Sequence, residues 1–379
     1  MKDEFLAILS HELRTPMSAV LGWLHLARHG ALTPEQRDKA LDTVERNARL
    51  QVQVVNDLLD VSRIVTGKLE LESAVVGIES VLRNAVDSAR LAAGARGIEL
   101  VMHEGGRNLA VRGSVSRLEQ VFTNLLSNAI KFSRDAGRVF IRMERREDKV
   151  AISVMDEGEG IAPGLLPRVF DVFRQADSSA RRRHGGLGLG LAIVSSLVAL
   201  HGGTIAAESR GQGHGATFIV TLPLVPAELA DTLREVASSA EDAPSLRGIR
   251  VLVVDDNADQ VEMMTEMLRL EGMSVMTAAN AADALLAAKS WKPEVLMLDI
   301  AMPGMDGYDL LARMRGDAGV PQGALPAIAI TGFASESDQT RARAAGFQGH
   351  LAKPFEVQAL RRMIARVTAA HRADRPSVT

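Results

Sequence analysis

The first 67 residues carry apolar side chains at alternating steps of three and four, the spacing of a coiled-coil seam. The first half of this seam consists of Leu6, Leu9, Leu13, Pro16, Val20, Trp23 and Ala27. After a capping-box sequence at 33–36, with Pro34 in the first helical turn, it resumes at Leu41, Val44, Ala48, Gln51, Val55, Leu58 and Val65. Because two helices with such narrow seams cannot bury themselves as one hairpin, the spacing predicts a dimeric four-helix bundle.

His11 lies two residues beyond Leu9, about 200° around the predicted helix, so we expect it to point away from the seam. Glu12 could hold one ring nitrogen protonated and leave the other free to attack. An isolated His–Glu pair on a helix is usually only a solvated pair, and a structural coiled coil is the corresponding alternative. Pro16 removes a backbone hydrogen bond, which predicts a bend just after His11.

The composition excludes several classes of function. A net charge of −3 provides no basic field for nucleic acid or an anionic membrane, and one Tyr and two Trp leave little aromatic surface for stacking bases. The absence of Cys excludes disulfides and thiolate ligands. Since there is no run of about eighteen apolar residues, we expect a chain without a membrane segment.

From 68 to 225 the pattern predicts an α+β domain. Helices are expected at 78–96, 116–132 and 189–201, and strands at 139–143, 150–154, 204–207 and 217–222. In the second of these helices Asn124, Asn128 and Lys131 share one face. Amide carbonyls suit Mg²⁺ and an ammonium suits phosphate. Because the flanking residues are apolar, the helix should be largely buried, and its polar face needs a functional explanation.

Asp156 follows an apolar strand, where its carboxylate could accept a hydrogen bond from the amine of adenine. Gly158 and Gly160, just beyond it, permit a close approach of a ligand to the backbone. A plain β-turn is the alternative explanation for this motif alone.

Three glycines, Gly186, Gly188 and Gly190, open an apolar helix and expose N–H groups that suit phosphate. This is neither G-x-G-x-x-G after a strand nor a P-loop, so both of those nucleotide motifs are excluded. The polar stretch that precedes these glycines is expected to form a lid. Thr217 follows a glycine-rich turn at 211–215 and begins the last strand of the domain.

A βα alternation begins after a linker at 226–248, with strands expected at 250–254, 275–277, 295–298, 327–330 and 350–352. Five such units predict a doubly wound parallel sheet that binds ligands at the carboxyl ends of its strands. Five polar residues follow strand ends: Asp255, Asp256, Asp299, Thr331 and Lys353. Three converging carboxylates favour a divalent cation, while the hydroxyl and the ammonium could contact a phosphoryl group.

Taken together, these motifs resemble those of hybrid sensor histidine kinases. The sequence FLAILSHELRTPMSAV at 5–20 resembles the H-box, and the four stretches of the middle domain resemble, in order, the N, G1, G2 and G3 boxes of the ATP-binding domain. Phe170 and Phe173 resemble its F box. VLVVDDN, LDIAMPGMDG and the KPF at 353–355 resemble the receiver domain. The implied folds are a dimeric helical hairpin, a Bergerat (GHKL) sandwich and a flavodoxin-like receiver.

The resemblance also implies roles for individual residues. His11 would be the phospho-acceptor, Glu12 its general base, and Thr15 the residue that positions water for dephosphorylation. The N and G boxes together with Thr217 would bind ATP, with Mg²⁺ on Asn128.

In the receiver, Asp299 would accept the phosphoryl group, and Mg²⁺ would bind Asp255, Asp256 and Asp299. Thr331 and Lys353 would sense the phosphoryl group, and the bond from Lys353 to Pro354 would be cis.

The sequence departs from the family pattern at Leu187, Ala216 and His350, and Asn124 distinguishes it from the gyrase-type ATPases. Leu187 and Ala216 replace a frequent Thr or Ser, which leaves those phosphate contacts to the backbone. Asn124 stands where gyrase-type ATPases carry a water-activating Glu, so we expect poor ATP hydrolysis. His350 stands where receivers often have Tyr or Phe, which puts the usual aromatic switch in doubt.

We therefore expect a cytoplasmic histidine kinase core, or the cytosolic part of a membrane-bound sensor, that acts as a homodimer with a histidine phosphotransfer protein or a response regulator. Its regions are expected to be a phosphotransfer hairpin at 1–67, an ATP-binding domain at 68–225, the linker, a receiver at 249–371 and a polar tail at 372–379. Two alternatives stay open: a net phosphatase that uses Thr15, and a nucleotide-gated scaffold in which the receiver inhibits the kinase.

Overall fold

The computed structural model describes residues 2–30, 32–67, 69, 71, 74–106, 109–172, 188–226, 246–317, 325–332, 336–353, 355 and 357–373. The chain divides into two compact units, 1–237 and 238–379. Several sequence predictions concern residues outside these ranges: Phe173, Gly186, Leu187, Pro354 and most of the linker. No helix in the described ranges is long and apolar enough to cross a membrane.

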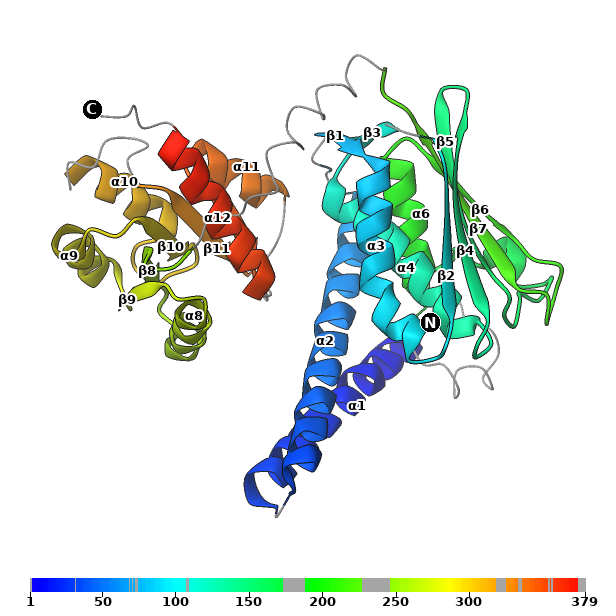
Figure 1. Ribbon diagram of the computed structural model, residues 1–379, viewed down its shortest axis with the longest axis horizontal. Coiled ribbons are helices and arrows are strands. Elements are labelled where there is room, and N and C mark those ends of the chain that lie inside the picture. The colour runs from blue at the N-terminus through cyan, green and yellow to red at the C-terminus, as the bar shows by residue number, and fades with distance from the viewer. Residues whose placement is uncertain are drawn as a thin grey trace. The chain divides into compact units, whose positions relative to one another are not determined.

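Two long helices, α1 (Lys2–His29) and α2 (Pro34–Val65), form an antiparallel hairpin (Figure 1). The predicted capping box is confirmed, because Thr33 Oγ1 accepts a hydrogen bond from the Gln36 backbone and Thr33 N donates to Gln36 Oε1. Helix α1 continues through Pro16, which is buried. In a single chain, seam residues such as Leu41 and Val55 stay exposed, and a second copy of the hairpin could cover them.

The rest of the first unit is an α/β sandwich with strand order β2-β4-β5-β7-β6. Its strands are β2 (Glu99–Gly105), β4 (Arg138–Arg146), β5 (Lys149–Asp156), β6 (Thr204–Glu208) and β7 (Ala216–Pro223). A separate antiparallel pair consists of β1 (Ala74–Gly77) and β3 (Ala110–Gly113). Strands β1, β2 and β3 were not predicted from the sequence.

Three helices cover one face of this sheet (Figure 1): α3 (Ile78–Gly94), α4 (Val115–Phe132) and α6 (Gly190–Leu200). Helix α4 is central because its apolar residues recur at helical spacing and are almost completely buried in the shared core, as Phe122 and Leu125 show. The apolar burial leaves one polar face of α4 at the edge of the core.

The second unit has a parallel sheet with strand order β12-β11-β10-β8-β9. Its strands are β8 (Arg250–Val254), β9 (Ser274–Ala278), β10 (Val295–Asp299), β11 (Ala327–Thr331) and β12 (Gly349–Ala352). Its helices are α8 (Ala258–Leu270), α9 (Ala281–Trp291), α10 (Gly307–Asp317), α11 (Glu336–Ala344) and α12 (Val357–Ala373). Separate apolar clusters cover the two faces, which explains the continuously apolar central strands and confirms the doubly wound prediction.

Candidate functional site

His11 lies on the exposed side of α1, with 78% of its side chain accessible. Its Nδ1 is 3.9 Å from Oε1 of Glu12, whose side chain is largely covered. Thr15 Oγ1 donates a 3.0 Å hydrogen bond to the backbone carbonyl of His11, one turn earlier. The exposure of His11 confirms its predicted orientation on the helix. The carboxylate of Glu12 lies near Nδ1, so Nε2 is the ring nitrogen directed away from Glu12.

The polar face of α4 carries Asn124, Asn128 and Lys131, all of them half-buried. The buried Nδ2 of Asn124 has no hydrogen-bond partner within the described part of the chain. Gly190, the first residue of α6, lies against this amide: a β-carbon there would be 3.9 Å from Asn124 Nδ2. A buried amide donor without a partner is uncommon, and it indicates a site for a ligand that accepts hydrogen bonds.

Lys131 lies at the last turn of this face, where burial lowers the pKa of its ammonium. The carboxylate of Glu12 acts in the opposite direction and raises the pKa of Lys131. The segment of α1 that carries His11 is therefore within electrostatic range of the polar face of α4.

Asp156 ends β5 as a buried carboxylate, and its Oδ1 accepts a 2.9 Å hydrogen bond from the backbone of Gly158. Burial raises the pKa of Asp156, against the backbone hydrogen bonds from Gly158 and Ala216 that favour its charged form. A buried acceptor of this kind can select a ligand that presents an N–H group.

The turn that follows Asp156 packs between the end of α4 and the glycine-rich turn at 211–215. Gly158 lies so close to the end of α4 that a β-carbon would clash with the carbonyl oxygen of Phe132, which also accepts a 3.1 Å hydrogen bond from Glu159 N. Gly160 adopts a φ of 68° against the carbonyl of Gly211. Both glycines allow a close approach of the protein's own backbone, and the close approach of a ligand stays a prediction.

The glycine-rich turn at 211–215 completes this corner. Gly213 N donates to Glu159 O and Gly215 N donates to Gly158 O, so two stretches distant in sequence interlock. Thr217 follows in β7 opposite Met155, next to the strand end that carries Asp156. Gly188 has a φ of 67° and lies two residues before the start of α6.

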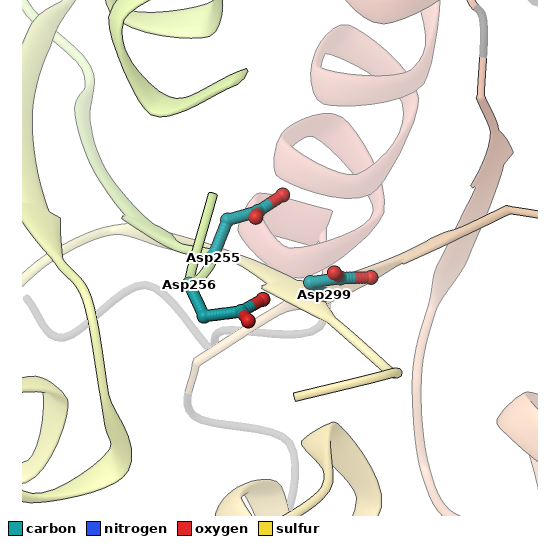
Figure 2. Close-up of side chains that lie close together, drawn as sticks. All are labelled: Asp255, Asp256 and Asp299. Atoms are coloured by element: carbon teal, nitrogen blue, oxygen red, sulfur yellow. The ribbon is translucent and has the colours of Figure 1, made fainter. Parts of the chain in front are cut away.

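In the second unit Asp255, Asp256 and Asp299 lie beside one another at the strand ends (Figure 2). One oxygen from each of the three carboxylates lies within 4.8 Å of the others. Lys353 Nζ is 2.7 Å from Asp255 Oδ2 and 3.2 Å from Asp299 Oδ2. The predicted convergence of these four residues is confirmed.

Thr331 ends β11 next to this cluster, but its hydroxyl is already engaged. Its Oγ1 is hydrogen-bonded to Nε2 of His350 on β12, at 2.8 Å. From the sequence, His350 was notable only because it replaces the Tyr or Phe that is frequent in receivers. Its hydrogen bond to Thr331 was not predicted.

Three family profiles match the chain in the order of its folded regions. The His Kinase A (phospho-acceptor) domain matches residues 1–67, the "Histidine kinase-, DNA gyrase B-, and HSP90-like ATPase" matches 113–226, and the response regulator receiver domain matches 251–365. The chain belongs to the hybrid histidine kinases.

Curated relatives of this hybrid histidine kinase include the sensor histidine kinase AruS of Pseudomonas aeruginosa, 34% identical over 97% of this chain and 36% of AruS. The virulence sensor protein BvgS of Bordetella bronchiseptica is 33% identical over 99% of this chain and 31% of BvgS. The chain thus spans about a third of the length of these relatives. A solved structure of full-length ShkA in complex with AMPPNP aligns over 96% of this chain with 26% identity and a TM-score of 0.45.

The chemistry of the aspartate cluster fits Mg²⁺. All three candidate ligands offer carboxylate oxygens, which hard divalent cations prefer, and they come from the strand ends of one rigid sheet. Lys353 balances only part of their charge, since it lies against two of the three carboxylates and Asp256 stays exposed. The receiver residues present can therefore hold the cation that the fold family implies.

One charged contact of the kinase region was not predicted from the sequence. Asp60 on α2 is buried and accepts hydrogen bonds from Arg117 and Gln120 on α4. A signal was available on α4, because Arg117 precedes Asn124 by seven residues and so shares its face. No comparable signal marks Asp60, which falls outside the apolar seam.

Proposed function

We propose that this chain transfers the γ-phosphoryl group of ATP to His11 and then to Asp299, as the kinase and receiver core of a phosphorelay. The observation that carries the proposal is the exposed imidazole of His11, held beside Glu12 and within electrostatic range of the polar face of α4. Phosphoryl transfer needs an accessible nucleophile and a bound donor. The Nδ2 of Asn124, which has no hydrogen-bond partner among the described residues, is suited to binding that donor.

In the first step Nε2 of His11 attacks the γ-phosphorus, and the bond to the bridging oxygen of ADP breaks. Glu12 lies by Nδ1, where it can stabilise the imidazolium and take its proton. Asn124, Asn128 and Lys131 would bind the nucleotide phosphates with Mg²⁺ at Asn128, and Asp156 would accept from the adenine amine. Asn124 cannot act as a base, so transfer to His11 should prevail over hydrolysis.

In the second step a carboxylate oxygen of Asp299 attacks the phosphorus, the P–N bond to His11 breaks, and the imidazole leaves as a neutral group because Glu12 returns the proton to Nδ1. Asp255, Asp256 and Asp299 would hold Mg²⁺, which when bound neutralises charge on the phosphoryl oxygens. The ammonium of Lys353, 3.2 Å from Asp299 Oδ2, would contact a phosphoryl oxygen on Asp299. A homodimer through the helical hairpin and a histidine phosphotransfer protein or response regulator as next acceptor complete the proposal.

The test is incorporation of γ-labelled phosphate from Mg²⁺-ATP into the wild type, His11→Gln and Asp299→Asn. We expect no label in His11→Gln, an acid-labile phosphohistidine that persists in Asp299→Asn, and acid-stable label only where both residues are present. Nucleotide binding without label in any of the three proteins would overturn the kinase and favour a nucleotide-gated scaffold.

A further inference from the structure

The polar face of α4 extends beyond the three residues assigned to the nucleotide. Arg117, Gln120, Asn124, Asn128 and Lys131 follow one another at steps of three, four, four and three, so all five share one side of the helix. All five are half-buried, whereas the apolar residues between them are buried in the core. The nucleotide residues occupy the second half of this face, which leaves the first half without a role in binding ATP.

The first half binds Asp60 of α2. Arg117 Nη1 donates to both carboxylate oxygens of Asp60, at 2.9 and 2.8 Å, and Gln120 Nε2 donates to Oδ2 at 2.8 Å. Arg117 Nη1 also donates to Gln120 Oε1, which closes a three-membered network. The Asp60 side chain is 6% exposed and that of Arg117 is 17% exposed.

This network is embedded in an apolar contact that could hold the two parts together without it. Leu58, Val61 and Ile64 of α2 pack against the core of the ATP-binding sandwich. A buried ion pair adds little net stability, since the desolvation of its charges offsets their attraction, but it restricts the geometry in which two surfaces can meet. The network therefore contributes more to the orientation of α4 on α2 than to the stability of the contact between the two helices.

The C-terminal end of the polar face of α4 indicates why the orientation of this helix on α2 matters. Lys131 ends the nucleotide half of α4. Burial lowers its pKa, and the carboxylate of Glu12, the neighbour of His11, offsets part of that effect. One rigid helix is thus held to α2 at its first turns and lies within electrostatic range of the phospho-acceptor segment at its last turn.

We propose that Asp60 is a positioning residue for phosphoryl transfer: it holds Arg117 and Gln120 so that the nucleotide face of α4 is presented to His11. The inference rests on the proposed transfer to His11 and adds the contact that aligns donor and acceptor. Asp60 is not one of the residues assigned to the nucleotide, so its loss should leave nucleotide affinity unchanged. Misalignment by a fraction of a helical turn is enough to slow transfer severely.

The test uses the full chain with Asp60→Asn, Arg117→Gln and the double variant. Three quantities are measured: the initial rate of His11 labelling at saturating Mg²⁺-ATP, the Kd of a non-hydrolysable ATP analogue, and the midpoint of urea unfolding. We expect each single variant to label about tenfold more slowly or worse, with an unchanged Kd. In the double variant no charge is left unpaired, so the unfolding midpoint should recover towards the wild type while the labelling rate stays low.

A matched control is Glu45→Gln, which removes an exposed ion pair with Arg49 on the same helix and should label like the wild type. A rate in Asp60→Asn that equals or exceeds that of the wild type would overturn the positioning role, as would a labelling rate in the double variant that recovers together with its stability. An unlabelled wild type would overturn the proposed transfer itself and this inference with it.

Discussion

Nε2 of His350 is hydrogen-bonded to Oγ1 of Thr331 at 2.8 Å, so the hydroxyl at the end of β11 is held by an imidazole on the neighbouring strand. After phosphorylation of Asp299, the hydroxyl of Thr331 would donate a hydrogen bond to a phosphoryl oxygen in place of its bond to His350. The bond to His350 therefore competes with the contact that a phosphorylated receiver needs.

We predict that His350→Phe increases the affinity of the receiver for beryllofluoride, a mimic of the phosphoryl group on aspartate. Because one hydrogen bond no longer has to be broken, the gain should be about 1 kcal/mol, or several-fold in Kd. Titration calorimetry in the presence of Mg²⁺ measures it, and Asp299→Asn serves as a control that should not bind in either background. Equal affinities for His350→Phe and the wild type would show that the bond does not compete.

Lys353→Met should destabilise the receiver in the absence of Mg²⁺. The variant leaves Asp255, whose side chain is fully buried, and Asp299 without the ammonium that lies against both. Losing one partner of such a pair costs about 2–3 kcal/mol, allowing for the partial exposure of the lysine. Urea unfolding with and without Mg²⁺ tests this, since cation binding to the cluster should restore part of the loss.

The control for that experiment is Arg269→Gln, which removes an exposed ion pair with Glu266 on α8. It should change the free energy of unfolding by less than about 0.5 kcal/mol. A Lys353→Met protein as stable as this control would contradict a role for Lys353 in balancing the carboxylates.

Gly158→Ala should weaken nucleotide binding and stability together. Its β-carbon would meet the carbonyl oxygen of Phe132, so the turn after Asp156 must move away from the end of α4. We expect a loss of about 1–3 kcal/mol in the free energy of unfolding and a clear rise in the Kd of an ATP analogue. Gly164→Ala is the matched variant, because a β-carbon there has nothing within 4 Å, and it should behave like the wild type.

The stability of the helical hairpin should fall as pH rises through the range in which Asp57 ionises. Burial raises the pKa of Asp57 to about 6 from a usual value of 3.8, helped by the charge of Asp60 and opposed by a hydrogen bond from Gln53. Between these values the folded state holds a proton that the unfolded state has lost, so the contribution present at low pH disappears by pH 7.

Asp57→Asn should therefore be more stable than the wild type at pH 7 by up to about 2 kcal/mol, and the advantage should vanish near pH 4. Urea unfolding at several pH values measures the difference. A constant difference between the two proteins across this range would exclude ionisation of Asp57 as its cause.

Much of the fold was predictable because its signals are local. The spacing of three and four in the first 67 residues predicted α1 and α2, and the capping box placed the start of α2 at Pro34. The βα alternation predicted the parallel sheet of the second unit, since strands buried on both faces are continuously apolar. Strand β2, by contrast, was missed because its sequence, ELVMHEG, is mixed in character, and its pairing with β4 stabilises it as a strand.

The candidate site also has parts that were predictable from the sequence and parts that were not. The sequence by itself determined which chemical groups are available: an imidazole beside a carboxylate, an amide face on α4, and carboxylates at strand ends, all encoded by the spacing of near neighbours. Only the tertiary structure decided which groups meet. Arg117 finds Asp60 across 57 residues and Thr331 finds His350 across 19, and both bonds exist because helices and strands distant in sequence pack together. Local periodicity sets the face on which a side chain lies, but its partner depends on how the whole chain buries its apolar surface.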